Sequence, residues 1–198
     1  MGQRLNIEIL HHGFLIANAY YHWSAYTSSS LDIVEQILKS SKDAFGKTGI
    51  RDVFDTAIDM LESTGAKLMS DELGAYECLH DRDFLGNELD VKSRNNNGVN
   101  RNGGLISITS YGMFTTRYCE EGRVQIDLDT KMINFNVFFE LDEDELEDVD
   151  IDDLSELDID FENISIDDFE NVKNLLLEMK DREEYTFKAK GKIYTMIE

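Results

Sequence analysis

Between Glu140 and Val172 the chain carries 17 acidic residues and no lysine or arginine. Apolar residues recur every two or three positions inside this acidic segment, at Leu146, Val149, Ile151, Leu154, Leu157, Ile159, Phe161, Ile164 and Ile166. A disordered acidic tail lacks such anchors. Because the pattern separates apolar from charged side chains, we expect the segment to dock on a folded domain and to project its carboxylates into solvent.

The negative charge of the chain is unevenly distributed. Residues 1–139 contain 13 basic and 19 acidic residues, a net charge of −6, whereas residues 140–198 contain 6 basic and 22 acidic residues, a net charge of −16. Affinity for nucleic acid comes largely from cations that replace counterions on phosphate, so this segment repels nucleic acid. The acidic segment is therefore expected to bind the basic surface of another protein, and no nucleic acid directly.

Hydrophobic periodicity predicts an α+β fold of antiparallel β-hairpins with packed helices. Alternating residues predict three hairpins, at 4–23 around His11 to Gly13, at 124–139 around Asp129 to Lys131, and at 185–197 around Gly191. Apolar repeats predict helices after the serines at 28–30, with a capping box at Ser29 and Asp32, at 53–61, and at 165–180. We expect a core domain at 1–139, with the acidic segment, a helix and a terminal hairpin at 140–198 packed on it.

Composition favours a folded protein of the cytoplasm. The chain has 198 residues, 41% of them hydrophobic, which is enough to bury a core. It contains no run of about 18 uncharged apolar residues and no apolar signal region near the N-terminus, so neither a membrane span nor export is expected. Cys78 and Cys119 lack the spacing of a metal knuckle and are expected to be reduced thiols.

Signatures of cofactor and metal sites are absent from the sequence. No glycine-rich phosphate loop ends in Lys-Ser or Lys-Thr. Asp148, Asp150 and Asp152 alternate like the start of an EF-hand loop, but Asp153 and Ile159 stand where such a loop needs glycine and glutamate. Asp127 and Asp129, with Glu140 or His80, form a weaker candidate set for a hard divalent ion. The sequence therefore predicts no cofactor and no metal site.

An aromatic and polar run offers an alternative site. The run is ANAYYHWSAYT, from Ala17 to Thr27, and includes Asn18 and His22. These two side chains would suit a small hydrolase or nuclease, with His22 as an acid or base near neutral pH. Strand alternation, however, makes half of the run ordinary core, and no nucleophile and base pair is evident. The sequence thus favours a binding protein over an enzyme.

Two stretches carry a resemblance to known proteins. These are ANAYYHWSAYTSSSL, from Ala17 to Leu31, and NRNGGLISIT, from Asn100 to Thr109. In them the chain resembles small proteins encoded by phages and prophages of Gram-positive bacteria, whose motifs have no assigned chemistry. The resemblance implies a non-structural phage product in the host cytoplasm. Small acidic proteins in that setting resemble inhibitors of host defence, including anti-CRISPR and anti-restriction proteins.

The leading prediction is an inhibitor that mimics nucleic acid and binds a host defence protein that depends on nucleic acid. Regularly spaced carboxylates would imitate phosphates and occupy a basic groove of that protein. The predicted binding residues are Asp142, Glu143, Asp144, Glu145, Glu147, Asp148, Asp150, Asp152, Asp153, Asp158 and Asp160. Two alternatives stay open: the carboxylates solvate an outer face and nothing more, or the apolar side of the segment packs against a second copy in a homo-oligomeric scaffold.

Overall fold

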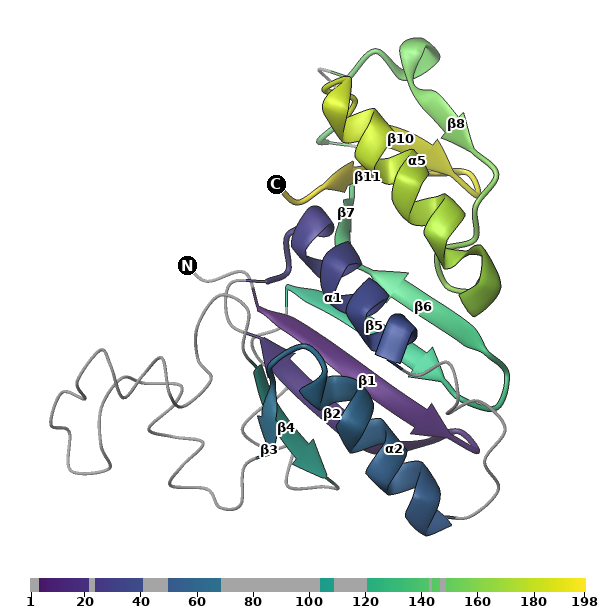
Figure 1. The fold of residues 1–198 in the computed structure, drawn as a ribbon. Coiled ribbons are helices and arrows are strands. Elements are labelled where there is room, and N and C mark those ends of the chain that lie inside the picture. Colours follow the sequence, from purple (N-terminus) through teal and green to yellow (C-terminus); the bar gives the residue numbers. More distant parts are fainter. Residues whose placement is uncertain are drawn as a thin grey trace, which may run out of the picture.

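The structure, a computed structural model, describes residues 4–21, 24–40, 50–68, 104–108, 121–142, 144–146 and 149–198. In these ranges the chain forms three α-helices and two β-sheets, in agreement with the predicted α+β class (Figure 1). None of these helices is both long and apolar enough to cross a lipid bilayer. Cys78 and Cys119, His22 and His80 lie outside the described residues.

The larger sheet has seven strands in the order β3-β4-β2-β1-β5-β6-β9. Their bounds are β1 Leu5–His11, β2 Phe14–Tyr21, β3 Lys67–Leu68, β4 Gly104–Ile108, β5 Gly122–Asp127, β6 Met132–Asn136 and β9 Ile164–Ser165. The first predicted hairpin is confirmed, because β1 and β2 pair antiparallel around His12 and Gly13. Both turn residues have positive φ, as a tight hairpin turn requires. The second predicted hairpin is confirmed by antiparallel β5 and β6.

The two hairpins join through a parallel contact that the sequence did not predict. Strand β1 pairs with β5 in parallel, from Leu5 opposite Gly122 to Leu10 opposite Asp127. Alternate residues of both strands are completely buried, namely Leu5, Ile7 and Ile9 of β1 and Val124 and Ile126 of β5. Because β1 and β5 run in the same direction, their carboxyl ends meet at one edge of the sheet.

Two helices cover one face of the larger sheet (Figure 1). Helix α1 spans Thr27–Ser40 and α2 spans Ile50–Glu62, followed by Gly65 with the positive φ of a helix C-terminus. The predicted start of α1 at a capping box on Ser29 is wrong. The helix already includes Thr27, and the hydroxyl of Ser30 donates to the carbonyl of Thr27 at 2.8 Å. The serine cluster therefore lies inside the first turns of the helix.

The smaller sheet has four strands in the order β7-β11-β10-β8. Their bounds are β7 Phe138–Glu140, β8 Ser155–Leu157, β10 Thr186–Ala189 and β11 Lys192–Met196. The third predicted hairpin is confirmed, with Lys190 and Gly191 at positive φ in its turn. Helix α5, Phe169–Asp181, lies along this sheet (Figure 1) and follows a short 3-10 turn, η3, at Ile166–Asp168. The predicted helix thus exists but begins four residues later than expected.

Val137 marks the passage from one sheet to the other. The sequence predicted one strand from Met132 to Phe139, whereas β6 ends at Asn136 and β7 starts at Phe138 in the smaller sheet. Val137 and Phe138 are both buried, and two consecutive buried residues break strand alternation. The predicted domain boundary after residue 139 falls inside β7, and the division into two domains stays a prediction.

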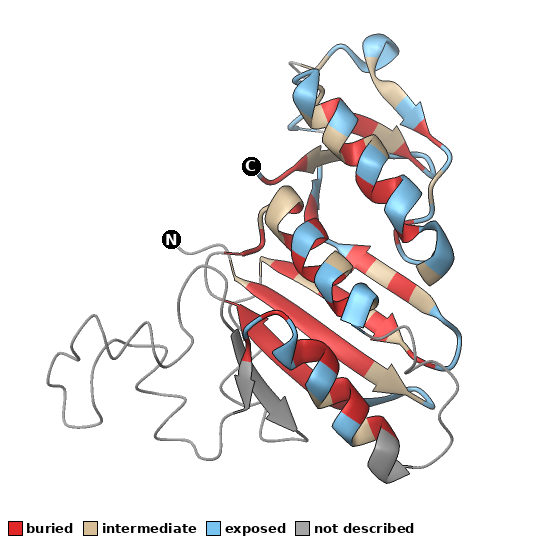
Figure 2. Cartoon of the chain, in the orientation of Figure 1, coloured by how far each residue is buried: buried red, intermediate tan, exposed pale blue. Residues whose placement is uncertain are grey.

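A single hydrophobic core extends under both sheets (Figure 2). At its centre Phe135 of β6 meets Phe138 of β7 with ring centroids 5.7 Å apart and Phe169 of α5 at 6.0 Å. Phe138 in turn meets Phe187 of β10 edge-on at 5.4 Å. Aromatic pairs in this geometry contribute beyond the area they bury. The acidic segment packs against this aromatic core through its buried residues Leu157, Phe161 and Ile164.

Candidate functional site

The predicted binding residues that the structure describes are all solvent-exposed. They are Asp142, Asp144, Glu145, Asp150, Asp152, Asp153, Asp158 and Asp160. We call the surface formed by these residues and by the exposed Glu156, Glu162, Asp167, Asp168 and Glu170 the acidic face. The side chain of Asp158 is 98% exposed. Glu143, Glu147 and Asp148 lie outside the described residues, so their contribution stays a prediction.

Apolar residues of the same segment attach it to the core. Leu157, Phe161 and Ile164 are buried, and Ile159 and Ile166 pack against them in part. Ile151, in the short 3-10 turn η2 at Ile151–Asp153, is 40% exposed and is not part of the described core. The prediction of a docked acidic segment is confirmed, with its firm attachment beginning at Leu157.

Some carboxylates of the acidic face organise their own backbone. An oxygen of Asp142 accepts hydrogen bonds from the backbone N–H groups of Asp144 and Glu145, each at 3.2 Å. An oxygen of Asp160 accepts from the N–H of Glu162 at 3.0 Å. Aspartate commonly forms turns in this way, so these two residues have a structural role whatever else they do.

Other carboxylates of the face have no such role among the described residues. Asp150, Asp152 and Asp153 surround η2, and Glu156 lies on β8, the edge strand of the smaller sheet. No hydrogen bond or ion pair within the described ranges engages these four side chains. All four side chains are exposed to solvent.

Two lysines form ion pairs with carboxylates of the acidic segment. Lys190 Nζ lies 2.9 Å from Asp158 Oδ1, and Lys192 Nζ lies 2.8 Å from Glu140 Oε2. The hydrogen bond from Lys190 and its positive charge lower the pKa of Asp158. Both lysines come from the hairpin of β10 and β11, so the cations stand beside the acidic segment and not within it.

Asn18, the first residue of the alternative site, lies in the middle of the larger sheet. Asn18 is buried on β2, opposite Glu8 of β1 and Ser107 of β4. Glu8 is also buried and accepts a hydrogen bond from Gln125 Nε2 at 2.7 Å. His22, the proposed acid or base, is not among the described residues. A pocket formed by Asn18 and His22 thus stays a prediction.

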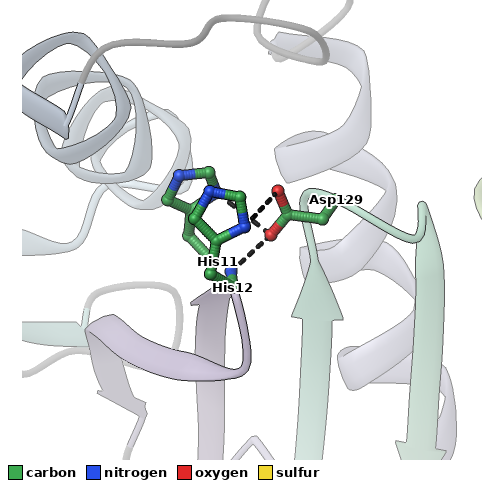
Figure 3. Close-up of side chains that lie close together, drawn as sticks. All are labelled: His11, His12 and Asp129. Carbon is green, nitrogen blue, oxygen red and sulfur yellow. Dashed lines mark hydrogen bonds and ion pairs between the residues drawn. The ribbon is translucent and has the colours of Figure 1, made fainter.

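A second polar cluster, which the sequence did not predict, lies at the edge of the larger sheet where β1 and β5 end. Figure 3 shows His11, His12 and Asp129 turned toward one another. His11 Nδ1 lies 3.0 Å from Asp129 Oδ2, and His12 Nδ1 lies 3.2 Å from Asp129 Oδ1. The backbone N–H of His12 also donates to Asp129, and this hydrogen bond lowers the pKa of the carboxyl group. The three residues bring two imidazoles and one carboxylate together.

Local patterns explain each residue of this cluster separately. His11 and His12 lie at the turn of the first hairpin and Asp129 in the turn of the second, and His12 and Asp129 are 117 residues apart in the sequence. Only the parallel pairing of β1 with β5 places the two turns side by side. The predicted cation set of Asp127 and Asp129 with Glu140 is not assembled, since Glu140 lies in the smaller sheet and binds Lys192. The alternative with His80 lies outside the described residues and stays a prediction. Asp127 instead accepts hydrogen bonds from the N–H groups of Asp129 and Thr130.

The chain was compared with protein families, with curated proteins and with solved structures. No family model, no curated protein and no solved structure matches the chain.

Proposed function

We propose that this chain is a binding protein whose acidic face occupies a basic, nucleic-acid-binding groove of another protein. The observation that carries the proposal is the one-sided segregation of charge from Asp142 to Glu170. Its described carboxylates are exposed, its apolar residues from Leu157 onward are buried or partly buried, and the segment contains no lysine or arginine.

Physical chemistry favours a basic protein as the partner. A dense field of one sign speeds encounter with an oppositely charged surface and rejects surfaces of like charge. Grooves that bind nucleic acid are lined by lysine and arginine, which pair with any regularly displayed anion. The unengaged carboxylates of Asp150, Asp152, Asp153 and Glu156 are the most suitable substitutes for phosphates.

The resemblance to phage-encoded proteins narrows the class of partner. It makes a nucleic-acid-dependent defence protein of the bacterial host the expected target, and inhibition by competition with nucleic acid the expected effect. The inhibitor would then act in the cytoplasm of that host without chemistry of its own.

The test compares two variants that lose the same number of negative charges. The first carries Asp150→Asn, Asp152→Asn, Asp153→Asn and Glu156→Gln on the acidic face. The matched control carries Asp55→Asn, Asp59→Asn, Glu62→Gln and Asp181→Asn, all exposed on α2 or α5. Each protein is immobilised, host lysate is passed over it, and the bound proteins are identified and tested for competition with their nucleic acid.

The original protein and the control are expected to capture the same basic protein and to release it as salt increases, because exposed charges are screened. The acidic-face variant should lose that capture. Equal recovery by all three proteins, or a captured partner that still binds its nucleic acid, would refute the proposal.

A further inference from the structure

We propose that His11, His12 and Asp129 bind one divalent transition-metal ion. This site is separate from the acidic face and does not depend on the proposed function. Two imidazoles with one carboxylate form a common ligand set for zinc, iron and related ions, and they leave further coordination positions open.

The distances fit coordination by a small ion. Bonds of about 2.0–2.2 Å at a tetrahedral ion place two ligand atoms about 3.3–3.6 Å apart. The two histidine-to-carboxylate distances, 3.0 and 3.2 Å, lie just below the lower end of that range, so a slight separation of the side chains makes room for the ion. One ligand atom from each of the three residues lies within 4.8 Å of the others, so a modest rotation of an imidazole completes the set.

The ligands are held in place by the fold. The N–H of His12 donates to the carboxylate of Asp129, and Asp127 fixes the turn that carries Asp129. Outer contacts of this kind orient metal ligands. The Nδ1 atom of His11 is covered from solvent and makes no well-formed hydrogen bond with any described residue, although Asp129 is 3.0 Å away. A metal ion would satisfy this buried nitrogen.

An ion can reach the cluster from solvent. The side chain of His12 is 71% exposed and that of Asp129 is 31% exposed, while His11 forms the inner wall at 13%. The strong negative charge of the whole chain raises the local concentration of cations. A bound ion would join the turn of the first hairpin to the turn of the second, and its open positions would accept water or a small anionic ligand.

Zinc binding tests the proposal on the full chain. Zn²⁺ is titrated against a chromogenic chelator with the unmodified protein, His12→Asn, Asp129→Asn and, as a control, Asp144→Asn on the acidic face. Asparagine is chosen to replace His12 because His12 has a positive φ of 51°, and asparagine adopts this left-handed backbone conformation readily. Loss of a ligand should weaken Zn²⁺ binding by roughly tenfold or more, whereas the control should bind like the unmodified protein. Equal affinity in all four proteins would overturn the proposal.

A second measurement needs no substitution. Paramagnetic Co²⁺ is added to the unmodified, isotope-labelled protein, and the broadening of amide signals is followed by NMR. Signals of residues 10–13 and 127–130 should broaden first, and added Zn²⁺ should restore them. Broadening that begins in residues 150–170 would place the ion on the acidic face and refute the proposed site.

Discussion

Lys173 is a charged residue in an unusual position. It lies on α5 and is only 8% exposed, and its Nζ is 3.1 Å from both Asp32 Oδ1 and Glu35 Oε2 on α1. Burial disfavours the charged amine, but the hydrogen bonds that Lys173 donates to Asp32 and Glu35 outweigh it and raise the pKa of Lys173. This one side chain therefore ties the helix of the acidic region to the first helix of the chain.

We predict that Lys173→Met lowers the free energy of unfolding by about 1–3 kcal/mol, because the variant keeps the apolar stem but leaves Glu35 with one partner fewer. Lys39→Met is the matched control. Lys39 binds the same carboxylate at 2.7 Å but is 63% exposed, so its loss should change stability by less than about 1 kcal/mol. Urea denaturation measures both, and equal effects would contradict the prediction.

Glu35 should make stability depend on pH. The hydrogen bond from Lys39, followed by that from Lys173, lowers the pKa of Glu35 below its ordinary value of 4.5. A carboxyl group with a depressed folded-state pKa stabilises the fold above its unfolded pKa and loses this contribution as the pH falls through the folded value. The stability difference between the unmodified protein and Glu35→Gln should thus be largest near neutral pH and shrink below pH 4.5. Denaturation at several pH values tests this, and a constant difference would refute it.

Among the elements, the first turn of α1 connects three distant segments. The N–H of Thr27 donates to the carbonyl of Ile197 at 2.7 Å, and the N–H of Ile197 donates to the hydroxyl of Thr27 at 3.1 Å. The same hydroxyl donates to the carbonyl of Val137 at 3.4 Å, where the chain passes between the sheets. Ser28 and Lys180 both bind Glu198 nearby. One buried hydroxyl thus links the start of a helix, the sheet junction and the end of β11.

We predict that Thr27→Val destabilises the fold by about 1–3 kcal/mol, because it leaves a buried N–H and a buried carbonyl without their partner. Thr27→Ser keeps the hydroxyl and loses one methyl group, so its cost should stay near or below about 1 kcal/mol. Thermal denaturation of both variants provides the measurement. A serine variant as unstable as the valine variant would show that packing, not hydrogen bonding, governs this position.

Local sequence patterns predicted the helices and hairpins better than the pairing of strands that are distant in the sequence. The turns at His12 and Gly13 and at Lys190 and Gly191 follow from short-range backbone preferences, so all three hairpins were predictable. The parallel pairing of β1 with β5 depends on burial across 117 residues, which no local pattern encodes. Exposed carboxylates of the acidic face between Asp142 and Asp160, apart from Glu156, were predicted from the local pattern of charge. The cluster of His11, His12 and Asp129 was not, because it depends on the pairing of β1 with β5.

At the scale of the whole molecule, the net charge of −22 opposes compaction. Described ion pairs such as Lys190 with Asp158 neutralise few of the 41 acidic residues. Most carboxylates of the acidic face repel one another across solvent, and this repulsion is released on unfolding. The fold tolerates it because the apolar residues from Leu157 onward attach the segment to the aromatic core.

We predict that sodium chloride stabilises the protein. Raising its concentration from 10 to 300 mM shortens the screening length from about 30 Å to less than 10 Å, and each kcal/mol of relieved repulsion should raise the Tm by about 2–4 °C. The acidic-face variant described above should start from a higher Tm at low salt and respond less. A Tm that falls with added salt would show that ion pairs outweigh repulsion.

The pairing of β1 with β5 also determines when the protein can fold during its synthesis. Glu8 meets Gln125 only after 117 further residues have been made, which takes a ribosome about 6–23 s. Until then Leu5, Ile7 and Ile9 lie on β1 of the first hairpin, and β5, the strand that pairs with the other edge of β1, has not yet been made. The nascent chain therefore presents an apolar strand to the cell for seconds, a period in which chaperones that bind extended apolar segments would find it.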